Sequence, residues 1–279
     1  APSLQPQPTF DSPPRDSTLT WTDELSEKYC HFSSPGRLSS LVQSEGVFYA
    51  VRSSDARSVW RYQPGEAEGE KIAESMTEDG KFIEKLRVND GWLVMLIFDH
   101  PLHIQGWRIE ALNLVTREQQ RVIDNILAAE DVIYLDMELQ GDLLYFLTRT
   151  VGNEQSQKHS EIRVFNLADG SEKLLLTSEP DLLFNQLAIS EKYLMISQSA
   201  NGEDLAADFP ILFYNLQSGN FEDLMEISGS LPMIKGALAA WSEQGPKRFP
   251  ETIKIFDFAS GLSWPMAIKS AQPSDFYLS

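Results

Sequence analysis

The sequence predicts an all-β protein, a β-propeller in which about five four-stranded antiparallel sheets stack as blades around one axis. Two features recur along the chain at intervals of roughly 45 to 50 residues, which is within the period of propeller repeats. One feature is a tight polar turn between two apolar runs. The other is a strand that ends in Asn or Asp just before a second turn. Two independent features with one period predict five related units.

The first feature marks the turn between the first and second strands of each unit. Gly, Asn and Asp are frequent in such turns because they tolerate positive φ, which tight hairpins require. The five turns are at residues 43–46, 89–91, 140–141, 190–191 and 235–236. The connection between these two strands is therefore expected to be minimal in every unit.

The second feature marks the end of the third strand. An aromatic or aliphatic run is followed by Asn or Asp and then by a turn, and a short fourth strand comes after most of them. The five examples are at residues 60–65, 109–114, 163–170, 212–219 and 254–261. In the second unit we expect strands at 82–88, 92–98, 107–114 and 119–123. An isolated sheet of this kind exposes two apolar faces, and stacking in a closed ring covers both.

The two ends of the chain bear on domain organisation and ring closure. Residues 1–16 are rich in Pro, Ser and Gln, so we expect a flexible linker followed by a single propeller domain at 17–279. Strand-like stretches at 17–23, 27–32 and 274–279 leave closure open. Five blades are favoured, and a sixth blade built from the termini is the alternative. The linker predicts an extracytoplasmic protein, either secreted, periplasmic or a tethered ectodomain with an anchor upstream.

The charge of the chain narrows the class of partner. With 23 Lys and Arg against 41 Asp and Glu, the net charge is −18. Nucleic-acid binding rests on cationic side chains that neutralise phosphates, so no nucleic-acid partner is expected. The longest compact apolar run, 92–98, is far too short to span a bilayer and suits a buried strand.

The motif around the third and fourth strands carries a family resemblance. An apolar strand, then Asn or Asp, a turn with Gly, and a following Leu or Trp occur at 164–174, 213–224 and 255–264. This pattern resembles the TolB-type and related WD-like bacterial propellers, over residues 37–266. The second unit departs from it, because 113–117 lacks the Gly, and the Trp-Asp pair of true WD repeats is absent. The resemblance implies a binding or scaffolding role, often outside the cytoplasm, and brings no catalytic residues with it.

The connections between second and third strands are the long ones, at 53–59, 99–106, 151–160, 199–209 and 242–250. Long loops on a rigid scaffold often carry binding, and in known propellers these connections share one face. We therefore expect this face to bind a protein or carbohydrate partner. The candidate binding residues are Asp55, Arg57, His100, His103, Lys158, His159, Asp204, Lys247, Arg248 and Phe249.

Three histidines of that face are the candidates for a metal site. His100 and His103 lie close together after Asp99, and His159 is in the equivalent connection of the next unit. Imidazole and carboxylate ligands suit zinc. No third ligand is fixed by the spacing, so we favour solvated histidines and expect no cofactor.

The leading functional prediction is a non-catalytic binding or scaffolding propeller. The alternative is a glycosidase-like hydrolase, which needs two carboxylates projecting from the inner strands. Glu84 and Asp136 form the catalytic pair in that alternative. Asp136 and Glu138 should point to the same side of one strand, because side chains alternate along a strand.

Overall fold

The computed structural model describes residues 37–63, 68–76, 82–100, 103–124, 132–150, 158–180, 182–200, 209–222, 227–244 and 250–267. In these ranges the regular elements are all β-strands, and they form five consecutive quartets. The first quartet is β1 (Leu38–Ser44), β2 (Val47–Arg52), β3 (Asp55–Tyr62) and β4 (Glu70–Glu74). The second is β5 (Phe82–Val88), β6 (Trp92–His100), β7 (His103–Asn113) and β8 (Gln119–Asp124). The third is β9 (Val132–Gln140), β10 (Leu143–Thr150), β11 (His159–Asn166) and β12 (Glu172–Thr177). The fourth is β13 (Leu182–Ile189), β14 (Tyr193–Ala200), β15 (Phe209–Asn215) and β16 (Asn220–Glu222). The fifth is β17 (Ser228–Lys235), β18 (Leu238–Gln244), β19 (Pro250–Asp257) and β20 (Leu262–Ala267).

Each quartet is an antiparallel meander in which consecutive strands pair. The first three quartets are separate four-stranded sheets. The fourth and fifth are joined into one eight-stranded sheet, because Phe209 and Pro210 at the start of β15 pair with Gly229 and Ser228 at the start of β17. The prediction of an all-β protein built from antiparallel sheets is confirmed.

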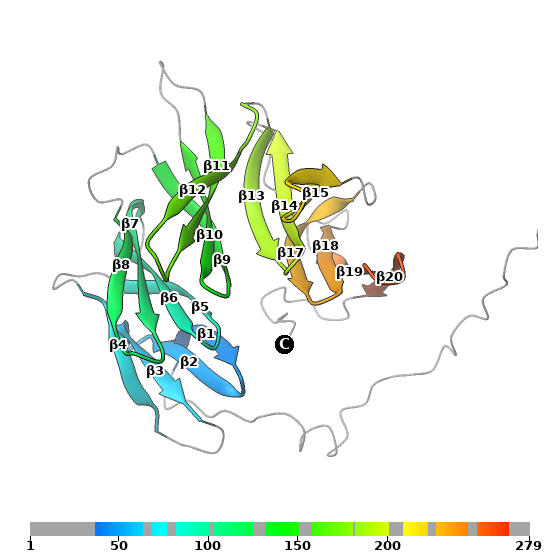
Figure 1. Cartoon of the computed structure of the whole chain (residues 1–279). Coiled ribbons are helices and arrows are strands. Elements are labelled where there is room, and N and C mark those ends of the chain that lie inside the picture. Colours follow the sequence, from blue (N-terminus) through cyan, green and yellow to red (C-terminus); the bar gives the residue numbers. More distant parts are fainter. Residues whose placement is uncertain are drawn as a thin grey trace, which may run out of the picture.

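The quartets follow one another along an arc in chain order (Figure 1). Their first strands contact one another in series, β1 with β5, β5 with β9, β9 with β13 and β13 with β17. These five strands line the inner side of the arc, and we call them the inner strands. The linker at 1–16 and the strand-like stretches at 17–23, 27–32 and 274–279 lie outside the described residues.

The core lies between successive quartets, and β6 shows how the sequence builds it. Its residues alternate between the two faces of the sheet, and both faces are buried. Leu93, Met95 and Ile97 pack toward the first quartet. Val94 and Leu96 pack toward the third, against Leu144. The continuous apolar run at 92–98 is therefore a strand covered on both sides.

The Asn or Asp that ends the third strand of the second to fifth quartets has a local function. Its side-chain oxygen accepts a hydrogen bond from the backbone N–H two residues later, and the residue four positions on returns a backbone hydrogen bond to its carbonyl. These capping residues are Asn113, Asn166, Asn215 and Asp257. The residue four positions on has positive φ, and it is Gly170, Gly219 and Gly261 in three units. In the second unit Arg117 takes the same conformation, with φ of 65°.

Two of the connections predicted to be long are short turns. Only Ser53 and Ser54 separate β2 from β3, so Asp55 and Arg57 lie within β3 rather than in a loop. The strands β6 and β7 extend as far as His100 and His103, which pair with each other across the hairpin. Antiparallel pairing uses backbone groups and continues through polar residues that we interpreted as loop. The other three connections lie for the most part outside the described residues.

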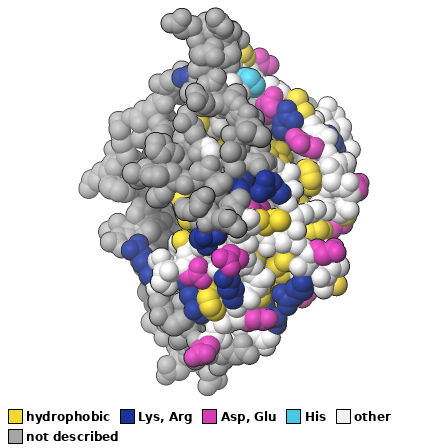
Figure 2. Space-filling model, turned by 90° about the vertical axis from the view of Figure 1, so that its left-hand side faces the viewer, with side chains coloured by type: hydrophobic (Ala, Val, Ile, Leu, Met, Phe, Trp, Pro, Cys, Tyr) yellow, Lys and Arg dark blue, Asp and Glu magenta, His cyan; other side chains and the backbone are white. Residues whose placement is uncertain are grey.

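On the outer side of the arc, charged side chains of both signs are interspersed over the described surface (Figure 2). Several form ion pairs between third and fourth strands, such as Arg61 with Glu70 at 3.3 Å and Arg163 with Glu172 at 2.9 Å. Exposed pairs of this kind contribute little to stability. Among the described residues there is no helix with the length and apolarity to cross a membrane.

Candidate functional site

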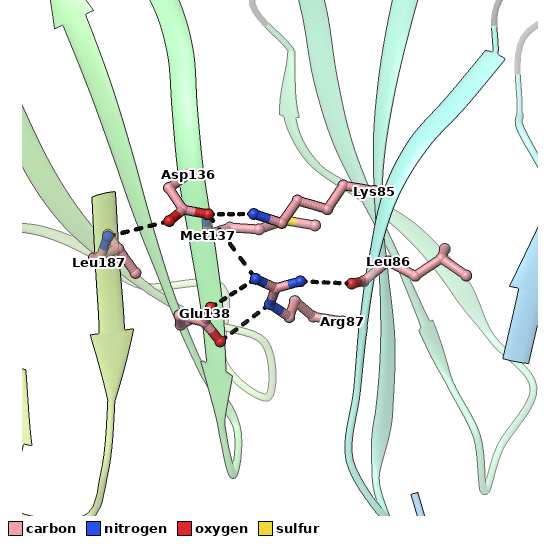
Figure 3. Close-up of polar contacts among 7 residues, drawn as sticks. All are labelled: Lys85, Leu86, Arg87, Asp136, Met137, Glu138 and Leu187. Atoms are coloured by element: carbon pink, nitrogen blue, oxygen red, sulfur yellow. Dashed lines mark hydrogen bonds and ion pairs between the residues drawn. The ribbon is translucent and has the colours of Figure 1, made fainter. Parts of the chain in front are cut away.

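Four charged side chains meet between the inner strands β5 and β9 (Figure 3). Lys85 and Arg87 are two residues apart on β5, and Asp136 and Glu138 are two residues apart on β9. Lys85 pairs with Asp136. Arg87 binds Glu138 with two hydrogen bonds, from Nη2 to Oε1 at 2.6 Å and from Nε to Oε2 at 3.0 Å. This two-pronged contact fixes the orientation of the Glu138 carboxyl group. We call these four residues the charged cluster.

Asp136 joins three inner strands. Besides Lys85 on β5, it accepts the backbone N–H of Met137 at 2.9 Å and the backbone N–H of Leu187 on β13 at 3.1 Å (Figure 3). Arg87 Nη2 lies 3.9 Å away, and the Asp136 side chain is only 11% exposed. The carboxylate is therefore held in one position by donors on both sides.

Glu138 has a different environment from its neighbour. Burial raises the pKa of Glu138 above its usual value, and the negative charge of Asp136 acts in the same direction. Arg87 and Lys85 lower this pKa, but burial is the larger effect. A carboxyl group with a raised pKa retains its proton to higher pH, which is the property of a general acid.

The backbone of β5 explains which residues reach β9. The pairing register of β5 with β6 shifts between Ile83 and Lys85, so Glu84 lies at a bulge. Glu84 is exposed, whereas Lys85 and Arg87 face β9. Glu84 and Asp136 are the catalytic pair expected under the hydrolase alternative. Among the interactions of the described residues, no hydrogen bond or ion pair joins their side chains. The residue from β5 that meets Asp136 is Lys85.

The residue that directly follows the register shift of an inner strand carries a polar side chain in the second, third and fourth quartets. Asp136 and Gln186 both directly follow a register shift, as Lys85 does. The Gln186 side chain accepts the backbone N–H of Leu231 on β17 at 2.8 Å. Asp136 accepts the N–H of Leu187 in the equivalent way. Polar side chains at this position therefore connect successive inner strands, and the charged cluster is a specialised version of that connection.

A cavity of about 360 Å³ lies next to the charged cluster. Its walls come from β13, β17, β18 and β19, and Glu138 is the one carboxylate in its lining. A second cavity of about 560 Å³ shares Ile189, Ile234 and Lys235 with the first. Both lie beside the turns between first and second strands, at the opposite end of the strands from the connections where we expected the binding face.

The predicted binding residues that the structure describes are scattered. Asp55 accepts a hydrogen bond from Trp60 Nε1 at 3.3 Å within the first quartet. Arg57 is partly buried in β3. Lys158 is exposed just before β11, and His159 Nε2 lies 3.5 Å from Glu161 Oε1. Of the rest, Asp204, Lys247, Arg248 and Phe249 lie outside the described residues, as do the side chains of His100 and His103.

No group of three or more His, Cys, Asp or Glu side chains that could hold a metal ion occurs among the residues that can be placed. The charged cluster itself offers two carboxylates, but the positive charges of Lys85 and Arg87 lie beside them and would repel a metal cation. These side chains are therefore not arranged as a metal site.

Sequence comparison finds no matching family model and no matching curated protein. Comparison of the fold does find similar structures. An oligogalacturonate lyase in complex with manganese has a TM-score of 0.57 at 12% identity, over 79% of this chain and 61% of that one. An oligogalacturonate lyase from Vibrio parahaemolyticus has a TM-score of 0.57 at 11% identity, over 82% and 64%. TolB from Acinetobacter baumannii has a TM-score of 0.50 at 12% identity, over 85% and 56%. The chain thus spans about three fifths of the length of these lyases.

The similar structures are β-propellers, so the propeller class of the fold is supported and the resemblance to TolB holds at the level of fold. The comparisons correct the functional prediction. We expected a non-catalytic propeller because the long connections share one face and because the sequence contains no catalytic motif. Two of the similar structures are enzymes, and both fit with higher TM-scores than TolB does. The similar lyase structures therefore overturn the non-catalytic interpretation.

Proposed function

We propose that this chain is a propeller enzyme that hydrolyses glycosidic bonds, with Glu138 as the general acid and Asp136 as the second carboxylate. One observation carries the proposal. Two carboxyl groups on one face of an inner strand have contrasting surroundings, since the pKa of Glu138 is raised beside a cavity and Asp136 is held by N–H donors. Pairs of carboxyl groups in contrasting environments are typical of acid and base partners in glycosidases.

The reaction needs two proton transfers. Glu138 donates its proton to the glycosidic oxygen as the bond between that oxygen and the anomeric carbon breaks. Water adds to the anomeric carbon, and its proton passes to the carboxylate of Asp136. The products are a free sugar and a free alcohol. Both carboxyl groups lie beside Arg87 Nη2, at 2.6 Å for Glu138 and 3.9 Å for Asp136, so they are close enough to act on one glycosidic bond.

Lys85 and Arg87 are positioning residues in this scheme. Their hydrogen bonds orient the two carboxyl groups, and their charges limit how far burial raises the pKa of Glu138. Catalysis depends on geometry held within a fraction of an ångström, so fixed partners of this kind matter even though they do not touch the substrate.

The similarity to oligogalacturonate lyases raises elimination as the second candidate reaction. The described residues of this chain offer no three-ligand metal group, so we derive no step through a metal. The products distinguish the two reactions. Elimination yields an unsaturated sugar that absorbs ultraviolet light, and hydrolysis does not.

The test is a panel of umbelliferyl glycosides, with oligogalacturonate included, assayed by fluorescence and by ultraviolet absorbance. We expect hydrolysis of at least one glycoside, and a loss of roughly 10²- to 10⁴-fold in Glu138→Gln. Asp136→Asn should also be impaired. Glu84→Gln is the matched control on the neighbouring strand and should keep full activity. A silent panel, unsaturated product, or full activity in Glu138→Gln would each overturn the proposal.

We also propose that the five quartets are five blades of one propeller domain at 17–279, closed into a ring and located outside the cytoplasm. The serial contacts of the inner strands and the pairing of β15 with β17 support the ring. The Pro-rich segment 1–16 and the fold of TolB support the location. Small-angle X-ray scattering separates a closed ring from an open arc, and cell fractionation of the native source tests the location.

A further inference from the structure

We propose that the 360 Å³ cavity beside Glu138 binds the apolar leaving group of the substrate, so that the substrates are glycosides of aryl or alkyl alcohols. This inference rests on the proposed function and deepens it by naming the substrate class. It follows from which of the two acidic residues lines the cavity and from the chemistry of the cavity walls.

The position of the cavity assigns it to the leaving group. A general acid protonates the oxygen of the group that departs, so that group lies on the acid's side of the bond. Glu138 lines the cavity, and Asp136 does not. Asp136 instead faces Lys85 and the backbone of β13. The departing alcohol therefore occupies the cavity, and the sugar ring lies on the side of Asp136.

The walls of the cavity are unsuited to a sugar. Met233, Ile234 and Ile255 lie among its lining residues together with three alanines, and the only charged lining residues are Glu138 and Lys235. A sugar ring carries several hydroxyl groups, and each one buried without a hydrogen-bond partner costs free energy. None of the lining residues is aromatic, so no ring is present on which a sugar could stack. An apolar group has no such requirement.

The size of the cavity agrees with a small organic group. A volume of about 360 Å³ lies within the range of small-molecule sites, roughly 300 to 1,000 Å³. The adjoining cavity of about 560 Å³ extends the space past Ile189 toward Tyr193 and Phe258, whose rings stack at 4.7 Å between centroids. An aromatic or elongated alkyl alcohol therefore has room in the first cavity and a continuation into the second.

The first arm of the test measures binding without catalysis. Umbelliferone, the aromatic alcohol that umbelliferyl glycosides release, is titrated with the full chain and its fluorescence anisotropy is recorded. We expect saturable binding to wild type and to Glu138→Gln. Ala240 is buried and lines the cavity, so Ala240→Phe should fill the space and weaken binding by about tenfold or more. Ala168 is exposed in a turn of the third quartet, and Ala168→Phe is the matched control that should bind normally. Should Ala240→Phe fail to fold, Ala240→Leu replaces it.

The second arm measures turnover. With the sugar that the panel identifies, Ala240→Phe should lower kcat/KM for the umbelliferyl glycoside by about tenfold or more and leave the methyl glycoside within about twofold. No binding of umbelliferone, or equal binding by Ala240→Phe and wild type, would overturn the inference. Binding that depends on Ala240 without hydrolysis of any glycoside would instead overturn the proposed function and keep an apolar-ligand site. The two failures are therefore distinguishable.

Discussion

Replacing Arg87 by Met tests whether the charged cluster is a coupled unit. Met keeps most of the length of the Arg side chain and removes its charge and its two hydrogen bonds to Glu138. Glu138 would then be a partly buried carboxyl group with Lys85 as the remaining nearby cation. Because Arg87 lowers the pKa of Glu138, its removal raises that pKa further.

The magnitude follows from the geometry. Two unit charges about 4 Å apart attract by about 4 kcal/mol at an effective dielectric constant of 20. The side chains of Arg87 and Glu138 are 25% and 23% exposed, so solvent screens part of this attraction. We expect a coupling free energy of about 2 kcal/mol at neutral pH. A carboxyl group whose pKa is raised in the folded state loses its contribution to stability as the pH rises through that pKa. Because Arg87→Met raises the pKa of Glu138 further, the free energy of unfolding that this variant loses should grow from acidic to neutral pH.

The assay is a double-mutant cycle in urea, followed by tryptophan fluorescence. Wild type, Arg87→Met, Glu138→Gln and the double variant are compared at neutral pH and at a pH low enough to protonate Glu138. The cycle subtracts the other contacts of Arg87, because they are present in both backgrounds. The reasoning fails when Arg87→Met costs the same free energy of unfolding with and without the Glu138 carboxylate.

Three further predictions concern stability. Leu144 is fully buried between the second and third quartets, so Leu144→Asp should destabilise the protein by several kcal/mol, whereas Lys158→Ala at an exposed position should change stability by less than about 0.5 kcal/mol. Thermal unfolding measures both variants, and equal effects would contradict the assignment of Leu144 to a buried strand and Lys158 to an exposed connection. Arg117 has a φ of 65° where three other units have Gly, so Arg117→Gly should stabilise the protein by about 1 kcal/mol and raise its Tm; an unchanged or lower Tm would contradict this account of the turn. The free energy of unfolding of wild type should rise relative to that of Glu138→Gln as the pH falls through the raised pKa of Glu138. Urea unfolding at several pH values measures this difference, and a difference that does not change with pH would contradict a pKa raised by burial.

Much of the fold could be predicted because blade strands are short, apolar and separated by residues with special φ requirements. The first strand of the second unit was expected at 82–88 and is observed at the same residues. The capping role of Asn166 and Asn215 follows from their place between a strand and a Gly turn. Even the departure at Arg117 was visible as a missing Gly, although the backbone conformation it adopts was not.

The loops were harder to predict because side-chain polarity says little about backbone pairing. The stretch around His100 and His103 is polar and contains Pro101, which favoured a loop, yet β6 and β7 pair as far as both histidines. Bulges were also invisible in the sequence. The register shift beside Glu84 leaves that side chain exposed and brings Lys85 to the position from which it reaches Asp136.

The candidate site was only half predicted. Asp136 and Glu138 were expected on one face of an inner strand, and they are observed there (Figure 3). Their partners were missed, although a signal was present. Lys85 and Arg87 have the same two-residue spacing on the preceding inner strand, with opposite charge. Complementary charges at matching spacing on neighbouring inner strands would have predicted the cluster. The cavity could not be predicted, because it is formed by side chains from three quartets.

The free energy needed to remove the charged cluster from water indicates that the cluster does more than join two sheets. Moving charges out of water is expensive, and replacing a buried ion pair with well-packed apolar side chains is often neutral or stabilising. This chain already joins its second and third quartets with apolar packing, through residues such as Leu96, Trp107 and Phe146. Four charged groups on the inner side of the arc add little stability that such packing could not supply. They do hold two carboxyl groups in fixed and different surroundings beside a cavity, and this arrangement is what acid and base chemistry requires.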